Sequence, residues 1–131
     1  MLDSCGSATH GSVTLGSETP CMHEVIFSAS QQAERDVHAL DIANFLIDQG
    51  IHPPTVYFPL TVKESIMIEP TETESKQTLD KFIEMMLKAD QLILTDPASF
   101  HDFPKTMPIS RPDETKAARE LNTNFFAVNG A

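Results

Sequence analysis

The first strongly apolar stretch of the chain is Cys21–Ala29, which reads C-M-H-E-V-I-F-S-A. Its centre, Val25–Phe27, consists of β-branched and aromatic residues that favour a strand, and Pro20 stands where a strand can begin. The apolar residues of this stretch follow one another almost without alternation. The pattern predicts a central strand that is buried on both faces of a sheet.

A helical period follows over Gln32–Gln49. Apolar residues spaced by three and four positions form one stripe, made of Val37, Leu40, Ala43 and Ile47. Gly50 supplies the left-handed residue that commonly ends a helix, and the Pro53–Pro54 pair prevents continuation. We therefore expect a helix over Gln32–Gln49.

Two short extended segments come next, Thr55–Leu60 and Ser65–Glu69, and in both the apolar side chains alternate between two sides. The connection between them, Thr61–Glu64, is short enough for a hairpin. Pro59 has no amide hydrogen to donate. The first segment should therefore lie at a sheet edge or end early.

A second helical pattern runs from about Glu72 to Leu94. Thr71 and Glu74 have the spacing of a capping box, in which two side chains satisfy the free amides at a helix start. Asp96-Pro97 should close the helix. The expected buried face consists of Leu79, Phe82, Ile83, Met86 and Ile93.

The two ends of the chain differ from this middle part. Residues 1–19 are rich in Gly, Ser and Thr and predict a flexible lead-in, while residues 20–95 hold the predicted strands and long helices. Residues 96–131 begin with a proline-rich stretch, Pro97–Pro112, that predicts a connector running over the surface. Asp113–Leu121 predicts a short helix within this last part.

The order strand, helix, strand, strand, helix predicts an α+β fold. We expect a small three-stranded, mostly antiparallel sheet with the two long helices on one face. The other face of such a sheet lacks cover and would suit docking against a larger body.

Composition excludes several classes of function. The chain has 131 residues and a net charge of −10, with nine Lys and Arg against nineteen acidic residues. A chain this acidic is not expected to bind the phosphate backbone of nucleic acid. No apolar run approaches the roughly 20 residues of a membrane helix. The first thirty residues contain no Lys or Arg, which argues against a targeting peptide, so we expect a cytoplasmic protein without membrane or nucleic-acid partners.

No self-sufficient active site can be assembled from the residues alone. The glycines form no phosphate-binding loop, no serine sits in a G-x-S-x-G elbow, and the histidines lack metal-site spacing. His23 and Glu24 fall in a stretch that is predicted to be buried, where ionisable groups either pair with each other or line a site. His52 is expected on a loop, with the same two alternatives, and capping explains the acids from Glu69 to Glu74.

Several longer pieces resemble one protein family. Between Pro20 and Arg119 the chain contains, in order, P-C-M-H-E-V, A-L-D-I-A, G-I-H-P-P-T-V-Y-F-P-L, I-M-I-E-P-T-E-T-E-S-K and K-A-A-R. These pieces resemble the C-terminal region of glycine dehydrogenase (decarboxylating), the P-protein of the glycine cleavage system. The resemblance is greatest to subunit 2 of its bacterial two-subunit form. It implies the small C-terminal domain of a fold-type-I pyridoxal-phosphate enzyme.

The resemblance also implies what this chain lacks. The family decarboxylates glycine with pyridoxal phosphate and passes the aminomethyl group to the lipoyl arm of H-protein. Its cofactor lysine lies in an H-K-T setting in a large domain, and none of the six lysines here has that setting. We therefore expect no cofactor bound to this chain alone, no catalytic residue in it, and no activity without the large domain and the other P-protein subunit.

On this interpretation the residues expected nearest the active-site cleft are His23, Glu24, His52 and Glu69. The resemblance assigns them no catalytic step, and no metal site is expected among them. A second hypothesis from another class is a free-standing α+β module that binds an amino acid or serves as an interaction domain. Glycine binding by the chain without any cofactor would favour this second hypothesis.

Overall fold

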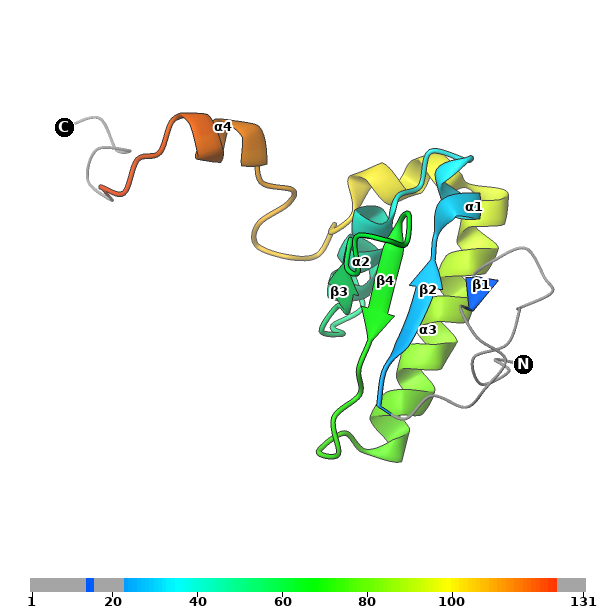
Figure 1. Cartoon of the computed structure of the whole chain (residues 1–131). Coiled ribbons are helices and arrows are strands. Elements are labelled where there is room, and N and C mark those ends of the chain that lie inside the picture. The colour runs from blue at the N-terminus through cyan, green and yellow to red at the C-terminus, as the bar shows by residue number, and fades with distance from the viewer. Residues whose placement is uncertain (1–13, 16–22, 125–131) are drawn as a thin grey trace.

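Four strands form one antiparallel sheet in the order β1-β2-β4-β3. The computed structural model describes residues 14–15 and 23–124 of the chain. The strands are β1 (Thr14–Leu15), β2 (Val25–Ser28), β3 (Thr55–Val56) and β4 (Ser65–Ile68). The longer helices α2 and α3 both lie behind the sheet, and no helix of the described residues covers its front (Figure 1). The predicted α+β fold, a small antiparallel sheet with both long helices on one face, is confirmed (Figure 1), although the sheet has four strands where three were predicted.

The central strand β2 is buried on one face only. Phe27 pairs with Ile66 of β4, and both side chains belong to the core beneath the helices. Their neighbours Ile26 and Met67 pair with each other and are only partly buried, because successive side chains in a strand point to opposite faces. The prediction of burial on both faces was therefore wrong. The additional strand β1 falls within the predicted lead-in, whose other residues lie outside the described part.

The first predicted helix is interrupted. It consists of α1 (Ser30–Ala33) and α2 (Ala39–Asp48), separated by a turn in which Asp36 has a positive φ of 63°. The apolar residue that extended the helical period, Val37, is fully buried within this connection. Helix α2 then starts where the carboxylate of Asp41 accepts the backbone amide of His38 at 2.7 Å. Gly50 follows α2 with the expected left-handed φ of 71°.

The second long helix, α3, is Lys76–Thr95. Its N-terminal cap is Ser75, whose hydroxyl oxygen accepts the amide of Thr78 at 3.1 Å, so the predicted capping box at Thr71 was wrong. Of the predicted buried face, Ile93 is buried and Phe82 and Met86 pack at the margin of the core. The other two members, Leu79 and Ile83, are exposed.

The segment after α3 returns to the core. Its 3-10 helix, η1 (Pro97–Asp102), buries Phe100 completely. Phe103, the first residue after this helix, is buried as well. The rings of both contact Phe45 of α2, with centroids 5.5 Å and 5.2 Å apart. The prediction that Pro97–Pro112 runs over the surface was therefore wrong for this part. The prolines in the stretch indicated a loop, but Phe100 and Phe103 within it belong to the core. The division of the chain at residue 96 stays a prediction.

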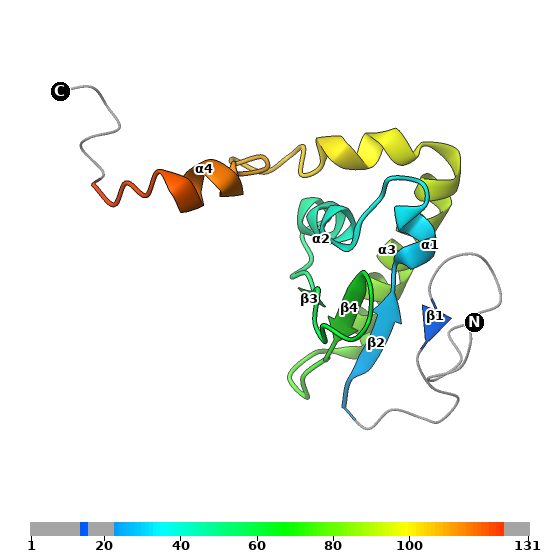
Figure 2. The same ribbon diagram turned by 45° about the horizontal axis from the view of Figure 1, so that its top comes forward.

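Beyond the core, Asp48 at the end of α2 holds the connector. Its Oδ1 accepts the backbone amides of Lys105 at 2.8 Å and Thr106 at 2.7 Å. The predicted short helix is α4 (Glu114–Arg119), which is capped by Asp113. Figure 2 shows α4 extending away from the sandwich. No residue of α4 is buried.

Candidate functional site

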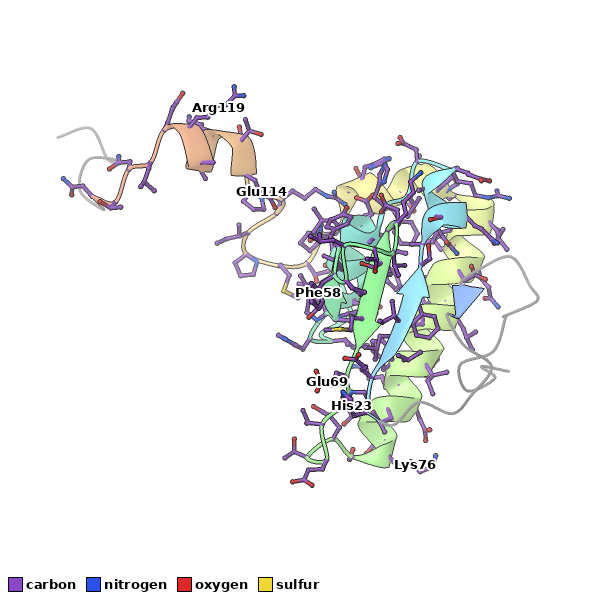
Figure 3. All side chains as sticks on the ribbon, in the orientation of Figure 1. His23, Phe58, Glu69, Lys76, Glu114 and Arg119 are labelled. Carbon is purple, nitrogen blue, oxygen red and sulfur yellow. The ribbon has the colours of Figure 1, made fainter. Side chains whose placement is uncertain are left out.

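The four residues that were predicted to line a cleft lie at one end of the sheet. His23 and Glu24 precede β2, His52 precedes β3, and Glu69 follows β4. Because β2 and β3 are both antiparallel to β4, the starts of β2 and β3 lie beside the end of β4. Figure 3 shows His23 next to Glu69. We call these four residues the open end of the sheet.

The side chains of the open end are weakly paired and face solvent. The His23 side chain is 65% exposed, and its Nε2 lies 3.9 Å from Oε2 of Glu24. Such an exposed contact contributes about 0–1 kcal/mol. His52 and Glu69 are exposed too, and within the described residues no His, Cys, Asp and Glu group could hold a metal ion. The predicted burial of His23 was wrong, because β2 begins only at Val25.

The opposite end of the sheet is tightly connected. Glu64, in the loop between β3 and β4, accepts the backbone amide of Ala39 at 2.9 Å through Oε2. Its Oε1 lies 3.1 Å from Nδ1 of His38. One carboxylate thus fixes the loop to the N-terminus of α2, where the helix dipole favours a negative charge.

A partly buried ion pair extends this network to the C-terminal segment. Arg111 places Nη1 2.6 Å from Oδ1 of Asp41, whose side chain is buried. The same guanidinium donates to the carbonyl oxygens of Phe100 at 2.7 Å and Phe103 at 2.8 Å. Three hydrogen-bonded partners satisfy the charge. We call Glu64, His38, Asp41 and Arg111, together with the loop from Tyr57 to Glu64, the bonded end.

Two of the three described non-glycine residues with a positive φ, Tyr57 and Glu64, lie in the bonded end. Asp36, Tyr57 and Glu64 are the non-glycine residues with positive φ in the described chain, at 63°, 60° and 51°. A non-glycine residue in this region costs on the order of 1 kcal/mol or more. Partial burial of the ring, and then the negative charge of Glu64, raise the pKa of Tyr57. Among the described residues, this arrangement brings together no nucleophile and base.

Sequence reasoning missed Asp41, Glu64 and Arg111. Asp41 stands three residues after His38 at the start of the α2 pattern, and that spacing is a signal for a helix start. Glu64 and Arg111 carry no such local signal, because their partners are distant in the sequence. Only the folded chain brings these groups together.

Comparisons with known proteins give a consistent result. The family described as "Glycine dehydrogenase, C-terminal domain" matches residues 8–123. A probable glycine dehydrogenase (decarboxylating) subunit 2 of Treponema denticola is 55% identical over 101 residues, which are 76% of this chain and 21% of the relative. The proteins of the same name from Staphylococcus saprophyticus and Bacillus velezensis are 52% and 53% identical, over 80% and 76% of this chain and 21% and 20% of their own lengths.

The chain therefore spans about a fifth of the length of these relatives. In the part that the structure describes, no helix is both long enough and apolar enough to cross a membrane.

Proposed function

Because the chain belongs to the family of glycine dehydrogenase C-terminal domains, we propose that it acts as the C-terminal domain of a glycine dehydrogenase (decarboxylating) subunit 2. The observation that carries this proposal is the 55% identity over 101 residues with a relative of that name. The reaction proposed for the whole enzyme is decarboxylation of glycine, with transfer of the aminomethyl group to the lipoyl group of H-protein. Pyridoxal phosphate is the cofactor that the family implies.

The residues of this chain do not fit a pyridoxal-phosphate site. A lysine that binds the cofactor must be desolvated so that its amine can lose its proton. All six lysines lie among the described residues and are exposed to solvent. Lys76 pairs with Asp80, Lys81 donates to the carbonyl of Gln49 at 3.3 Å, and Lys105 pairs with Asp102. We derive no catalytic step from these residues.

The chain contributes a surface at the open end of its sheet. On the proposed function, the open end supplies His23, Glu24, His52 and Glu69 to the wall of a cleft that a larger domain completes. Their side chains are free to meet such a partner because solvent already reaches them. The bonded end keeps the sheet, α2 and the C-terminal segment in a fixed relation while this happens.

The test is a grafted subunit. It is the Treponema denticola subunit 2 with its matched C-terminal region replaced by residues 8–123 of this chain, assembled with the other subunit of its enzyme. We expect glycine-dependent CO2 exchange, with lipoylated H-protein, within about tenfold of the parent enzyme. A misplaced domain would do worse, since small misplacements of reacting groups can cost about 100-fold.

The control is the same subunit with the matched region deleted, which should be inactive. A grafted subunit that folds and binds pyridoxal phosphate, but exchanges CO2 no faster than the deletion variant, would overturn the proposal.

A further inference from the structure

Three exposed apolar side chains stand together in the loop between β3 and β4. Tyr57, Phe58 and Leu60 are 43%, 54% and 89% exposed. Aromatic residues in such positions are enriched at the centres of protein interfaces, where they supply large contact areas. We call Tyr57, Phe58 and Leu60 the loop patch. Figure 3 labels Phe58 beside the edge of the sheet that β3 forms.

The loop that carries the patch is held rigidly. The amide of Tyr57 donates to the carbonyl of Ser65 at 2.8 Å, and the amide of Val62 donates to that of Pro59 at 3.1 Å. At the far end, the carbonyl of Lys63 accepts the hydroxyl of Ser28 at 2.8 Å. A surface that is already fixed loses little conformational entropy when it binds, so it gains affinity from the same contacts.

Backbone strain distinguishes the loop patch from a second group of exposed apolar side chains, on α3. Helix α3 also exposes a row of large side chains, namely Leu79, Ile83, Leu87 and Leu94. That row flanks the buried face of an ordinary amphipathic helix and requires no unusual backbone. The loop patch, by contrast, begins at Tyr57 with φ of 60°, in a loop that ends at Glu64 with φ of 51°. Strain of this kind persists where the surroundings enforce it and is concentrated at functional segments.

We propose that the loop patch docks against the part of a glycine dehydrogenase subunit 2 polypeptide that lies outside the matched region. This inference rests on the proposed function. The matched region makes up 21% of the Treponema denticola relative, so about four fifths of such a polypeptide is available to cover the patch. The patch presents two aromatic rings and a leucine without a charged group, so its chemistry fits the apolar centre of a protein interface.

Hydroxyl-radical labelling of side chains tests this directly, because Tyr, Phe and Leu are labelled only where solvent reaches them. Labelling is compared between the free chain and the grafted subunit. We expect Phe58 and Leu60 to be labelled about tenfold less in the grafted subunit, since residues at an interface centre are fully desolvated. Leu87 and Leu94, which are 52% and 53% exposed, should keep their labelling.

Substitution sharpens the comparison. The double variant Phe58→Asp, Leu60→Asp should return Tyr57 in the grafted subunit to the labelling of the free chain. The matched control is Leu87→Asp, Leu94→Asp on α3, which should leave Tyr57 protected. Equal labelling of Phe58 in the free chain and the grafted subunit would overturn the proposal.

The docking proposal and the proposed function fail separately. Protection of the loop patch in a subunit without CO2 exchange would support the docking surface and reject the proposed function. CO2 exchange without protection of the loop patch would support the proposed function and reject the docking surface. If the grafted subunit is insoluble, the chain is co-expressed with the remainder of the relative's subunit 2, and failure of the two to associate counts against the surface.

Discussion

The two ends of the sheet carry similar kinds of side chains, but those side chains are hydrogen-bonded to one another and to the backbone at one end and exposed to solvent at the other. The open end holds two histidines and two glutamates, and among these four described residues the one ion pair is the 3.9 Å approach of His23 to Glu24. The bonded end holds Asp41 and Glu64 as acceptors of hydrogen bonds of 2.9 Å or less, with a guanidinium closing the network. Similar residue types therefore hold the fold together at one end and remain accessible to a partner at the other.

This difference has a physical cause. At the bonded end, a helix N-terminus, a strained loop and the C-terminal segment converge, so each carboxylate finds donors that are fixed by the backbone. At the open end the strands stop and the charged side chains extend into solvent. Substitutions at the bonded end should change stability, and substitutions at the open end should change the function of the whole enzyme.

The largest effect is expected from Phe100→Ala. Phe100 is fully buried against the rings of Phe45 and Phe103, so truncation leaves a cavity and should cost about 4 kcal/mol of unfolding free energy. Denaturant unfolding measures this. Ile109→Ala, later in the same segment and exposed, is the control. Equal stability of the two variants would show that this segment is a surface connector after all.

The second largest loss of stability is expected from Arg111→Ala. Removing the guanidinium leaves the buried carboxylate of Asp41 without its closest charged partner, and His101, 4.0 Å away, is the remaining one. Because only the Asp41 side of the pair is buried, the expected cost is at most about 3 kcal/mol, the low end of the range for breaking a buried pair. Arg119→Ala in the exposed α4 is the control and should change the unfolding free energy by less than about 0.5 kcal/mol. An Arg111 variant as stable as the control would contradict the assignment of the bonded end.

The carboxylate of Asp48 should make the free energy of unfolding depend on pH. The amide of Thr106, which donates to Asp48, holds the pKa of this carboxyl below its ordinary value of 3.8. A lowered folded pKa stabilises the fold above the unfolded value, and this contribution is lost as pH falls through the folded pKa. Asp48→Asn should therefore cost about 1 kcal/mol at neutral pH.

The measurement is a series of unfolding curves between about pH 7 and pH 2, with the Asn variant converging on the parent at the acid end. Asp80→Asn, which removes an exposed helix pair, is the control. A constant difference across the whole range would show that the Asp48 charge has no part in holding the connector.

The smallest effect on stability is expected at the open end. His52→Ala and Glu69→Gln should each change the unfolding free energy of the free chain by less than about 0.5 kcal/mol, since both side chains are exposed. In the grafted subunit the same changes should slow CO2 exchange by about tenfold if these residues line the cleft. Unchanged exchange in both variants would remove them from the cleft.

Local patterns in the sequence were sufficient for much of the fold. The strands at Val25–Ser28 and Ser65–Ile68, the glycine stop at Gly50 and the end of α3 at Asp96 all follow from short-range periodicity and from residues that begin or end elements. The break at Asp36 was missed because Val37 fits a helical period equally well from within a loop.

The remaining features depend on contacts that no local pattern reveals. Phe100 joins the core from a proline-rich stretch, and Arg111 pairs with Asp41, which is distant in the sequence. For the candidate site, the resemblance selected four residues that the fold places at one end. It could not give their exposure, because burial of His23 depends on where β2 starts.

We propose that this chain is a supporting domain and that the chemistry of the enzyme lies in another part of the polypeptide. The most direct test is to incubate the free chain with pyridoxal phosphate and glycine, dialyse it, and record the absorbance of bound cofactor. We predict that no cofactor band survives dialysis and that glycine without cofactor does not bind. A band that survives and shifts with glycine would contradict the claim, and tight binding of glycine alone would favour a free-standing amino-acid-binding module.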